Sequence, residues 1–270
     1  MNPIWLITKI TFKEGIRNRI LFGITLLALL LFASNVVLTN LFSLEVGKVM
    51  VDLGFAALSL AGLSIIFFLG IGMLSQDIHN KTVYMIVGRP VTRAQYVMGK
   101  FGGMTLLLFV VMLILGFLAM VSFGIGSALR PGATMPRNFS WVSLLTTIGF
   151  HFLSLLIVLS VSFFFTVISS SIYLAMLFTF CIYFIGHSLE TIVKVLIKGE
   201  FMEVSPWYVG LMKGMSWLFP NLSAFDLKAN LAYGLPYDGA YLIWTGLYGC
   251  AYIVIMFLLT LVIFKQKDLC

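Results

Sequence analysis

The sequence is poor in charged residues. Asp, Glu, Lys and Arg make up 10% of its 270 residues and hydrophobic residues make up 61%, whereas a soluble domain is about 25% charged. A water-soluble globule of this length cannot bury so much apolar surface, because its surface area is too large relative to its core. The composition therefore excludes the soluble and disordered classes and indicates a polytopic membrane protein.

Cysteines and enzyme motifs are also scarce. Cys181, Cys250 and Cys270 have neither paired nor CxxC spacing, so we expect neither a disulfide framework nor a zinc site. The sequence contains no GxxxxGK[ST], HExxH or GxSxG motif, which argues against a P-loop, a zinc protease site or a serine hydrolase site. We therefore expect the chain not to be an enzyme and to bind no cofactor or metal itself.

Long apolar stretches without Asp, Glu, Lys or Arg fill half of the sequence. A transmembrane helix needs about 20 mostly apolar residues, and six stretches reach or approach that length. The serine run at 169–171 separates the fourth stretch from the short fifth one and predicts a tight helical hairpin. We predict an all-α fold in one transmembrane domain, residues 1–270, with spans at 20–42, 53–74, 101–123, 142–168, 172–188 and 241–264.

The basic residues gather on one side of these predicted spans. The segments on the side of the termini hold ten basic and three acidic residues, whereas the segments on the other side hold seven of each. Because Lys and Arg concentrate in cytoplasmic loops, both termini are predicted to be cytoplasmic. The net charge of +7 therefore reflects membrane topology and does not indicate a nucleic-acid partner.

The segment before the first span, residues 1–19, predicts a helix that begins near Pro3. Lys9, Lys13 and Arg17 recur every four residues and share one face, while apolar side chains cover much of the remainder. This pattern is typical of an amphipathic helix that lies on the inner leaflet. A simple basic flank beside the first span is the alternative.

The longest inner loop, residues 75–100, predicts two short helical elements. Asp77 is placed to cap a helix that runs through residues 83–87 and ends before Pro90. Thr92 is placed to cap a second helix that continues into the third span. A short helix held between two membrane helices can dock into a groove on a soluble partner, and a solvated loop is the alternative.

The largest outer segment, residues 189–240, is rich in aromatic residues. Ser205 and Pro206 predict the start of one or two interfacial helices, which Pro220 and Asn221 would end. These helices between spans five and six could line an exit path or form a passive lid.

Two histidines and two glycines stand out within or beside the predicted spans. His151 and His187 make a weak case for a metal site, so we expect packed or interfacial side chains, and their roles stay open. Gly99 and Gly103 are spaced to allow a close helix contact.

Three stretches of the sequence combine into a recognisable pattern. The first is residues 12–19, Phe-Lys-Glu-Gly-Ile-Arg-Asn-Arg, before the first span. The second is Asp-Ile-His-Asn-Lys-Thr at 77–82, followed by Arg-Pro-Val-Thr-Arg at 89–93, Tyr96 and Gly99-Lys100. The third is residues 218–226, Leu-Phe-Pro-Asn-Leu-Ser-Ala-Phe-Asp. Together they resemble the membrane subunits of type-2 ABC exporters, and are most similar to the multicopper-enzyme-maturation and gliding branch of these permeases.

The resemblance implies a permease subunit that forms the translocation path for export of an unknown substrate across a prokaryotic inner membrane. It implies two kinds of protein partner, an ABC ATP-binding subunit that carries ATP and Mg, and a second permease chain in a homodimer or heterodimer. The 75–100 loop would contain the coupling helix. The positions that match the family's loop, and that would couple to the ATPase, are Asp77, Thr82, Tyr84, Arg89, Pro90, Arg93, Tyr96 and Lys100.

Two other functions fit a polytopic membrane protein. A self-contained channel or secondary carrier would be expected to have charged residues within its spans or matched broken helices in two repeats, and the sequence shows neither. A structural membrane anchor for an enzyme complex is the third possibility.

Overall fold

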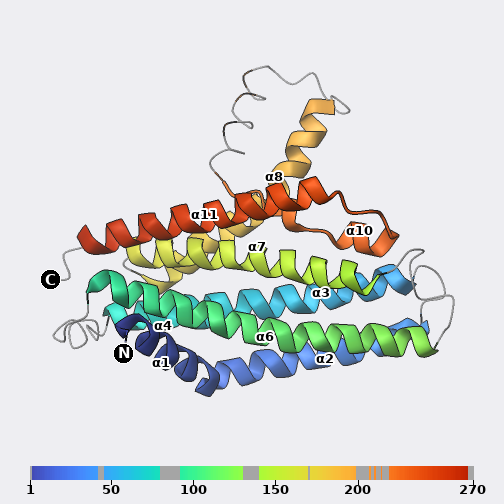
Figure 1. The fold of residues 1–270 in the computed structure, drawn as a ribbon, viewed down its shortest axis with the longest axis horizontal. Helices are drawn as coiled ribbons and strands as arrows, with labels where there is room; N and C mark the ends of the chain where they lie inside the picture. Colours follow the sequence, from blue (N-terminus) through green and yellow to red (C-terminus); the bar gives the residue numbers. More distant parts are fainter. Residues whose placement is uncertain are drawn as a thin grey trace.

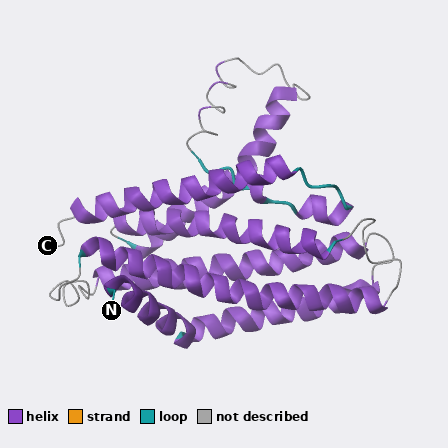
Figure 2. Cartoon of the chain, viewed as in Figure 1, coloured by secondary structure: helices purple, strands orange, loops and turns teal. Residues whose placement is uncertain are grey.

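The structure, a computed structural model, consists of helices and loops, with no strand in its described part (Figure 2). That part comprises residues 2–41, 46–79, 92–129, 140–169, 171–198, 207, 210, 214 and 219–266. The fold is therefore all-α, as the sequence predicts. The elements are α1 (Pro3–Arg17), α2 (Arg19–Leu41), α3 (Val46–Ser64), η1 (Ile65–Ile71), α4 (Gly72–His79), α6 (Arg93–Leu129), α7 (Trp141–Ile168), α8 (Ile172–Lys198), η2 (Ser223–Phe225), α10 (Lys228–Tyr233) and α11 (Gly239–Gln266).

Most of the long helices lie side by side in one bundle, and the end of α8 projects from it (Figure 1). α2 packs against α3 and α6, while α7 packs against η1, α8 and α11. The core lies between α3 with η1, α6 and α7, where side chains such as Phe55, Leu107 and Phe163 are fully buried. α11 covers α7 from the side and leaves most of its own apolar surface exposed, as expected for a helix that faces lipid.

Four of the predicted spans lie in helices that are long and apolar enough to cross a membrane. These are Gly47–His79, Arg93–Ile125, Trp141–Ile168 and Gly239–Gln266. The predicted first span meets this test only as part of a helix pair, Pro3–Arg17 and Arg19–Ser34, which is bent by 60°. The apolar part of the fifth, Ile172–Ser188, is shorter. The described residues thus support four or five spans, and six spans stay a prediction.

The second apolar stretch is one continuous rod with a change of helix type in its middle. α3 continues into the π-helical η1, and η1 continues into α4. The residues Ile65, Ile66 and Leu69 of η1 are buried against neighbouring helices. Nothing in the apolar pattern predicts this segment, because a wider helical turn changes the hydrogen-bond register without requiring a particular residue type.

Two connections between helices can be compared with the sequence predictions. The hairpin between α7 and α8 is confirmed, because Ser169 ends α7 and α8 starts at Ile172. α8 runs on to Lys198, so the predicted outer segment begins inside a helix. Of the interfacial helices predicted from Ser205, only the helical residues Trp207, Gly210 and Gly214 belong to the described part, and the rest lie outside it.

The helix predicted before the first span is confirmed as α1. Pro3 is at its first position, and a break at Asn18 separates it from α2. Ile7, Thr8, Thr11 and Gly15 are its buried residues, and this face packs along α6. α1 therefore belongs to the bundle through one face and exposes the other.

Candidate functional site

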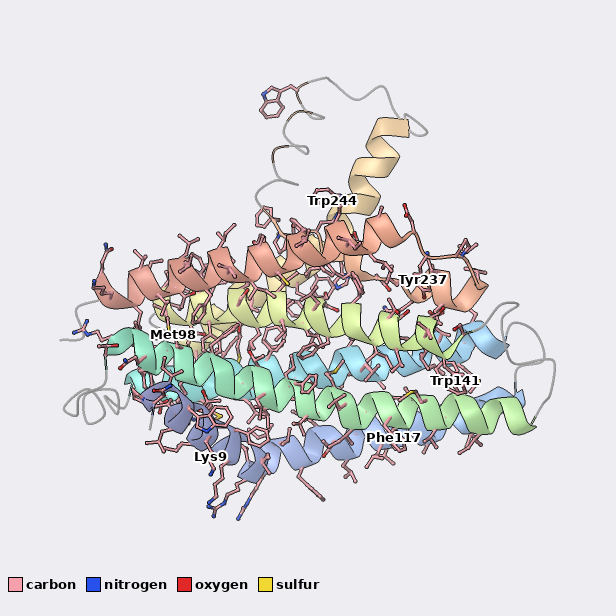
Figure 3. All side chains as sticks on the ribbon, viewed as in Figure 1. Lys9, Met98, Phe117, Trp141, Tyr237 and Trp244 are labelled. Atoms are coloured by element: carbon pink, nitrogen blue, oxygen red, sulfur yellow. The ribbon has the colours of Figure 1, made fainter. Side chains whose placement is uncertain are left out.

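Four helix ends meet at one end of the bundle, where the chain begins (Figure 1). The short helix α1, the end of α4, the beginning of α6 and the end of α11 all lie there. Lys9 and Met98 lie at this end in Figure 3, whereas Trp141 and Tyr237 lie at the opposite end. The predicted coupling residues that the structure describes are all at the first end.

The start of α6 is fixed by a capping box. The backbone amide of Gln95 donates to Thr92 Oγ1 at 3.3 Å, and the amide of Thr92 donates to Gln95 Oε1 at 3.0 Å. Each side chain therefore satisfies a backbone amide that the helix leaves without a partner. This confirms Thr92 as the predicted cap and defines where the chain leaves the 80–91 segment and enters α6.

A buried lysine lies at the centre of this end. Lys100 Nζ is 2.6 Å from Asp77 Oδ2 and 3.4 Å from Glu14 Oε2. The Tyr96 hydroxyl donates to the same Asp77 oxygen at 2.5 Å. Tyr96 and Lys100 are four residues apart, so they project from one face of α6 toward Asp77 on α4. We call Glu14, Asp77, Tyr96 and Lys100 the polar cluster.

Burial makes the polar cluster structurally important. The Lys100 side chain is 8% exposed, whereas the side chains of Asp77 and Glu14 are 19% and 52% exposed. An ammonium group removed from water is tolerated only when acids or dipoles compensate for its lost hydration. The lysine thus needs Asp77 above all, and their contact holds α4 against α6.

The cluster is closed toward α11 by an aromatic contact. The ring of Tyr96 is fully buried and stacks on Phe264, with ring centroids 6.4 Å apart. Arg93 lies one turn before Tyr96 and donates from Nη1 to the carbonyl of Lys265 at 3.4 Å. The end of α11 is therefore attached to the same face of α6.

The structure brings together three of the predicted coupling residues, Asp77, Tyr96 and Lys100, and places Arg93 beside them. The prediction that Asp77 caps a helix is wrong, because α4 extends through Asp77 to His79. Its carboxylate binds Lys100 and Tyr96 instead of a helix start. The remaining predicted coupling residues, Thr82, Tyr84, Arg89 and Pro90, lie outside the described residues.

Sequence reasoning did not assign Glu14 and Phe264 to this site. Glu14 stands in the Lys-Glu stretch that contributes to the family resemblance, which was the available signal for it. Phe264 carries no such signal, because one aromatic residue near the end of an apolar helix is indistinguishable from its neighbours.

The predicted close contact at Gly99 and Gly103 is confirmed, and its partner is α1. A Cβ atom on Gly99 would lie 2.6 Å from Ile7 Cβ, and one on Gly103 would lie 2.5 Å from Thr11 Cβ. Thr8 Oγ1 also donates to the Gly99 carbonyl at 3.2 Å. The missing side chains on α6 let the α1 backbone approach closely enough for this bond.

We expect Gly103→Val to weaken this contact strongly. A Cβ there would lie 2.5 Å from Thr11 Cβ and 2.9 Å from the Thr8 carbonyl oxygen, and backbone atoms cannot move aside cheaply. The expected loss is about 3 kcal/mol, at the upper end for overpacking. Thermal unfolding in detergent and proteolysis at Lys9 and Lys13 measure it.

The matched control for this change is Gly124→Val. Gly124 is also on α6, and a Cβ there meets nothing within 4 Å. This variant should behave like the unchanged protein. Equal losses from the two substitutions would contradict the close contact between α1 and α6.

The stretch that includes Pro220, Asn221 and Leu222 lies between α8 and α11. The amide of Leu222 donates to the Gly186 carbonyl on α8 at 3.0 Å, and the amide of Asn221 donates to the Tyr248 hydroxyl on α11 at 3.0 Å. Phe225 is buried beneath Gly249 of α11. This part of the family pattern therefore connects α8 to α11.

The two histidines are packed side chains, as predicted. His151 Nε2 is 3.3 Å from Ser59 Oγ, and its ring meets the edge of Phe55. His187 lies against the ring of Tyr183. Within the described part of the chain, no group of three or more His, Cys, Asp or Glu residues could hold a metal ion.

An apolar groove of about 470 Å³ lies between α3 with η1 and α8. Its lining contains no charged side chain, and Ser64 and Tyr173 supply its side-chain hydroxyl groups. Several of its residues, including Phe68 and Tyr173, are exposed on the surface of the bundle. The lining residues are Leu60, Leu63, Ser64, Phe67, Phe68, Tyr173, Met176, Leu177 and Phe180.

Comparison with known proteins agrees with the resemblance seen in the sequence. A family model described as ABC-2 family transporter protein matches residues 5–269. No curated protein matches the chain. The match supports a type-2 ABC permease and does not separate its branches, so the multicopper-enzyme-maturation and gliding branch stays a prediction. Because the match covers almost the whole sequence, the chain belongs to the ABC-2 family of transporter proteins and is a multi-pass membrane component of transport.

Proposed function

We propose that this chain is the permease of an ABC exporter in a prokaryotic inner membrane. Two permease chains would pair and bind two ATP-binding subunits on the cytoplasmic side. ATP and Mg would bind to those subunits, and this chain would bind neither. In this arrangement both termini, the 80–91 segment and the polar cluster are cytoplasmic, in agreement with the distribution of Lys and Arg.

The polar cluster is the observation that supports this proposal most directly. The 80–91 segment, where the coupling helix is predicted, follows α4 and precedes α6 in the chain. Lys100 joins those two helices through Asp77 just outside the segment, and Glu14 adds α1 to the same contact. A force from an ATP-binding subunit on this segment would therefore act on α1, α4 and α6 together.

A channel or secondary carrier has less support. Such proteins place ionisable side chains along the path within the membrane. Among the described side chains, Lys100 is the only buried Asp, Glu, Lys or Arg, and it lies in the second turn of α6, near the end of the apolar helix. The groove between α3 and α8 is lined without charge as well. These features favour a transporter in which a partner subunit supplies the energy for transport.

The decisive experiment measures retention of an ATP-binding subunit. This subunit is first identified by co-purification from native membranes, and the pair is then co-expressed. We expect the double variant Tyr84→Ala, Arg93→Ala to lower retention of this subunit at least about tenfold, equivalent to about 1.4 kcal/mol. Truncating an aromatic or arginine anchor at an interface commonly has an effect of this size or larger.

The matched control is Tyr233→Ala with Lys228→Ala at the other end of the bundle. These residues are again one tyrosine and one basic side chain, and both belong to α10. This control should retain the subunit. If the α10 variant loses the ATP-binding subunit and the Tyr84→Ala, Arg93→Ala variant retains it, the proposed orientation in the membrane is reversed. If no ATP-binding subunit co-purifies, the structural-anchor function gains support.

A further inference from the structure

α1 has two faces with different partners. Its buried face is pressed against Gly99 and Gly103 of α6, so the helix is held firmly on the bundle. The opposite face carries Lys9, Lys13 and Arg17, all exposed. At 100° per residue these three basic side chains fall within one quarter of the helix circumference, centred opposite the buried face.

The single acid of α1 does not neutralise this basic face. Glu14 lies at the edge of the buried face and its carboxylate is 3.4 Å from Lys100 Nζ. Within the described part of the chain, no carboxylate forms an ion pair with Lys9, Lys13 or Arg17. The polar cluster thus holds the only acidic side chain of α1 at Lys100, and the charged side chains of the outer face are all basic. Figure 3 shows Lys9 on the side of α1 away from α6.

Large apolar side chains surround the basic residues on the same outer face. Trp5, Leu6, Ile10 and Ile16 are each roughly half exposed. Trp favours the boundary between headgroups and acyl chains, and long basic side chains can reach phosphates from that depth. α1 is bent by 60° from α2 and packs along the first turns of α6, so its outer face lies on the surface beside the start of that helix.

We propose that the outer face of α1, defined by Trp5, Lys9, Ile10, Lys13, Ile16 and Arg17, binds the headgroups of anionic phospholipids. The basic side chains contact the phosphates, and the apolar side chains enter the upper acyl region. The combination of basic and apolar side chains favours a lipid surface over an acidic soluble protein. An acidic protein surface would pair with the basic groups but would not bury the apolar side chains. This binding does not depend on an ATP-binding subunit.

The test measures the phospholipid that the full-length permease retains. Protein in nanodiscs of phosphatidylglycerol and phosphatidylcholine is extracted in mild detergent, and bound lipid is identified by native mass spectrometry. We expect phosphatidylglycerol to be enriched over phosphatidylcholine. Lys9→Gln, Lys13→Gln, Arg17→Gln should lower that enrichment at least about tenfold, because each basic group near an anionic surface contributes appreciably.

Two controls separate the charge of α1 from general effects. The exchange Lys9→Arg, Lys13→Arg, Arg17→Lys keeps the charge and should keep the enrichment. Lys265→Gln removes an exposed charge at the same end but on α11, and it should also keep the enrichment. Equal losses from Lys265→Gln and the triple neutral variant would overturn the assignment to α1.

A further measurement needs no substitution at all. Raising salt from about 50 mM to about 500 mM shortens the screening length and should reduce enrichment on the unchanged protein. Enrichment that withstands salt, or that persists in the folded triple neutral variant, contradicts the proposal. Loss of an ATP-binding subunit with full lipid retention in that variant would assign the face to the subunit instead.

Discussion

Replacing Lys100 with methionine is expected to destabilise the permease by about 3 kcal/mol, the lower limit for breaking a buried ion pair. Methionine follows the lysine chain as far as Cε but leaves the Asp77 carboxylate without its cation. The Asp77 side chain is 19% exposed, so water can hydrate part of its unpaired carboxylate. We therefore expect a loss of stability at the lower limit. Thermal unfolding in detergent measures the change.

A double-mutant cycle separates the ion pair from ordinary packing. Asp77→Asn alone leaves the buried ammonium of Lys100 with the more distant Glu14, and it should also be strongly destabilising. The combination Asp77→Asn, Lys100→Met removes both charges, so we expect it to lose at least about 1 kcal/mol less than the sum of the single changes. Strict additivity would show that Lys100 and Asp77 do not interact.

The chain offers a matched exposed pair as a control. Lys228 and Asp226 are 3.3 Å apart, and both side chains are about one-third exposed. Lys228→Met should cost less than about 1 kcal/mol, as is usual for surface ion pairs. The contrast between Lys100 and Lys228 therefore tests whether burial, and not proximity alone, gives the polar cluster its effect.

Most helices can be predicted from this sequence, because an apolar run in a membrane must satisfy its backbone groups internally. Each of the six predicted stretches is helical wherever it is described. Local chemistry also defines several ends, such as Pro3 at the start of α1 and Thr92 at the start of α6. Those signals work because the groups involved are within three residues of one another.

The polar cluster could be predicted only in part. Asp77, Tyr96 and Lys100 were singled out through the family resemblance, but no local pattern pairs Lys100 with Asp77 or with Glu14. Those partners are separated by long stretches of sequence, and only helix packing brings them together. Asp77 has the residue type of a helix cap, but it lies inside α4, where Lys100 stabilises its carboxylate.

Phe225→Ala is expected to cost about 3–5 kcal/mol, the range for truncating a buried aromatic residue. Phe225 is 1% exposed, and its ring packs between Phe150 of α7 and Tyr248 of α11. Alanine would leave a cavity where η2 joins the two helices. Unfolding in detergent measures the loss, and Trp244→Ala, at a 72% exposed position on α11, should change stability little.

The tight fit between Phe225 and Gly249 provides a sharper test of the same contact. A Cβ on Gly249 would lie 2.9 Å from two ring carbons of Phe225 and 3.0 Å from Leu153 Cδ2, so Gly249→Ala alone should cost about 1–3 kcal/mol by overpacking. Leucine lacks those two ring carbons. Phe225→Leu combined with Gly249→Ala should therefore be more stable than the sum of the single changes predicts, since the added methyl occupies space that the shorter side chain vacates. If the two changes simply add, the stretch that includes Pro220 and Phe225 does not anchor α11 through this glycine.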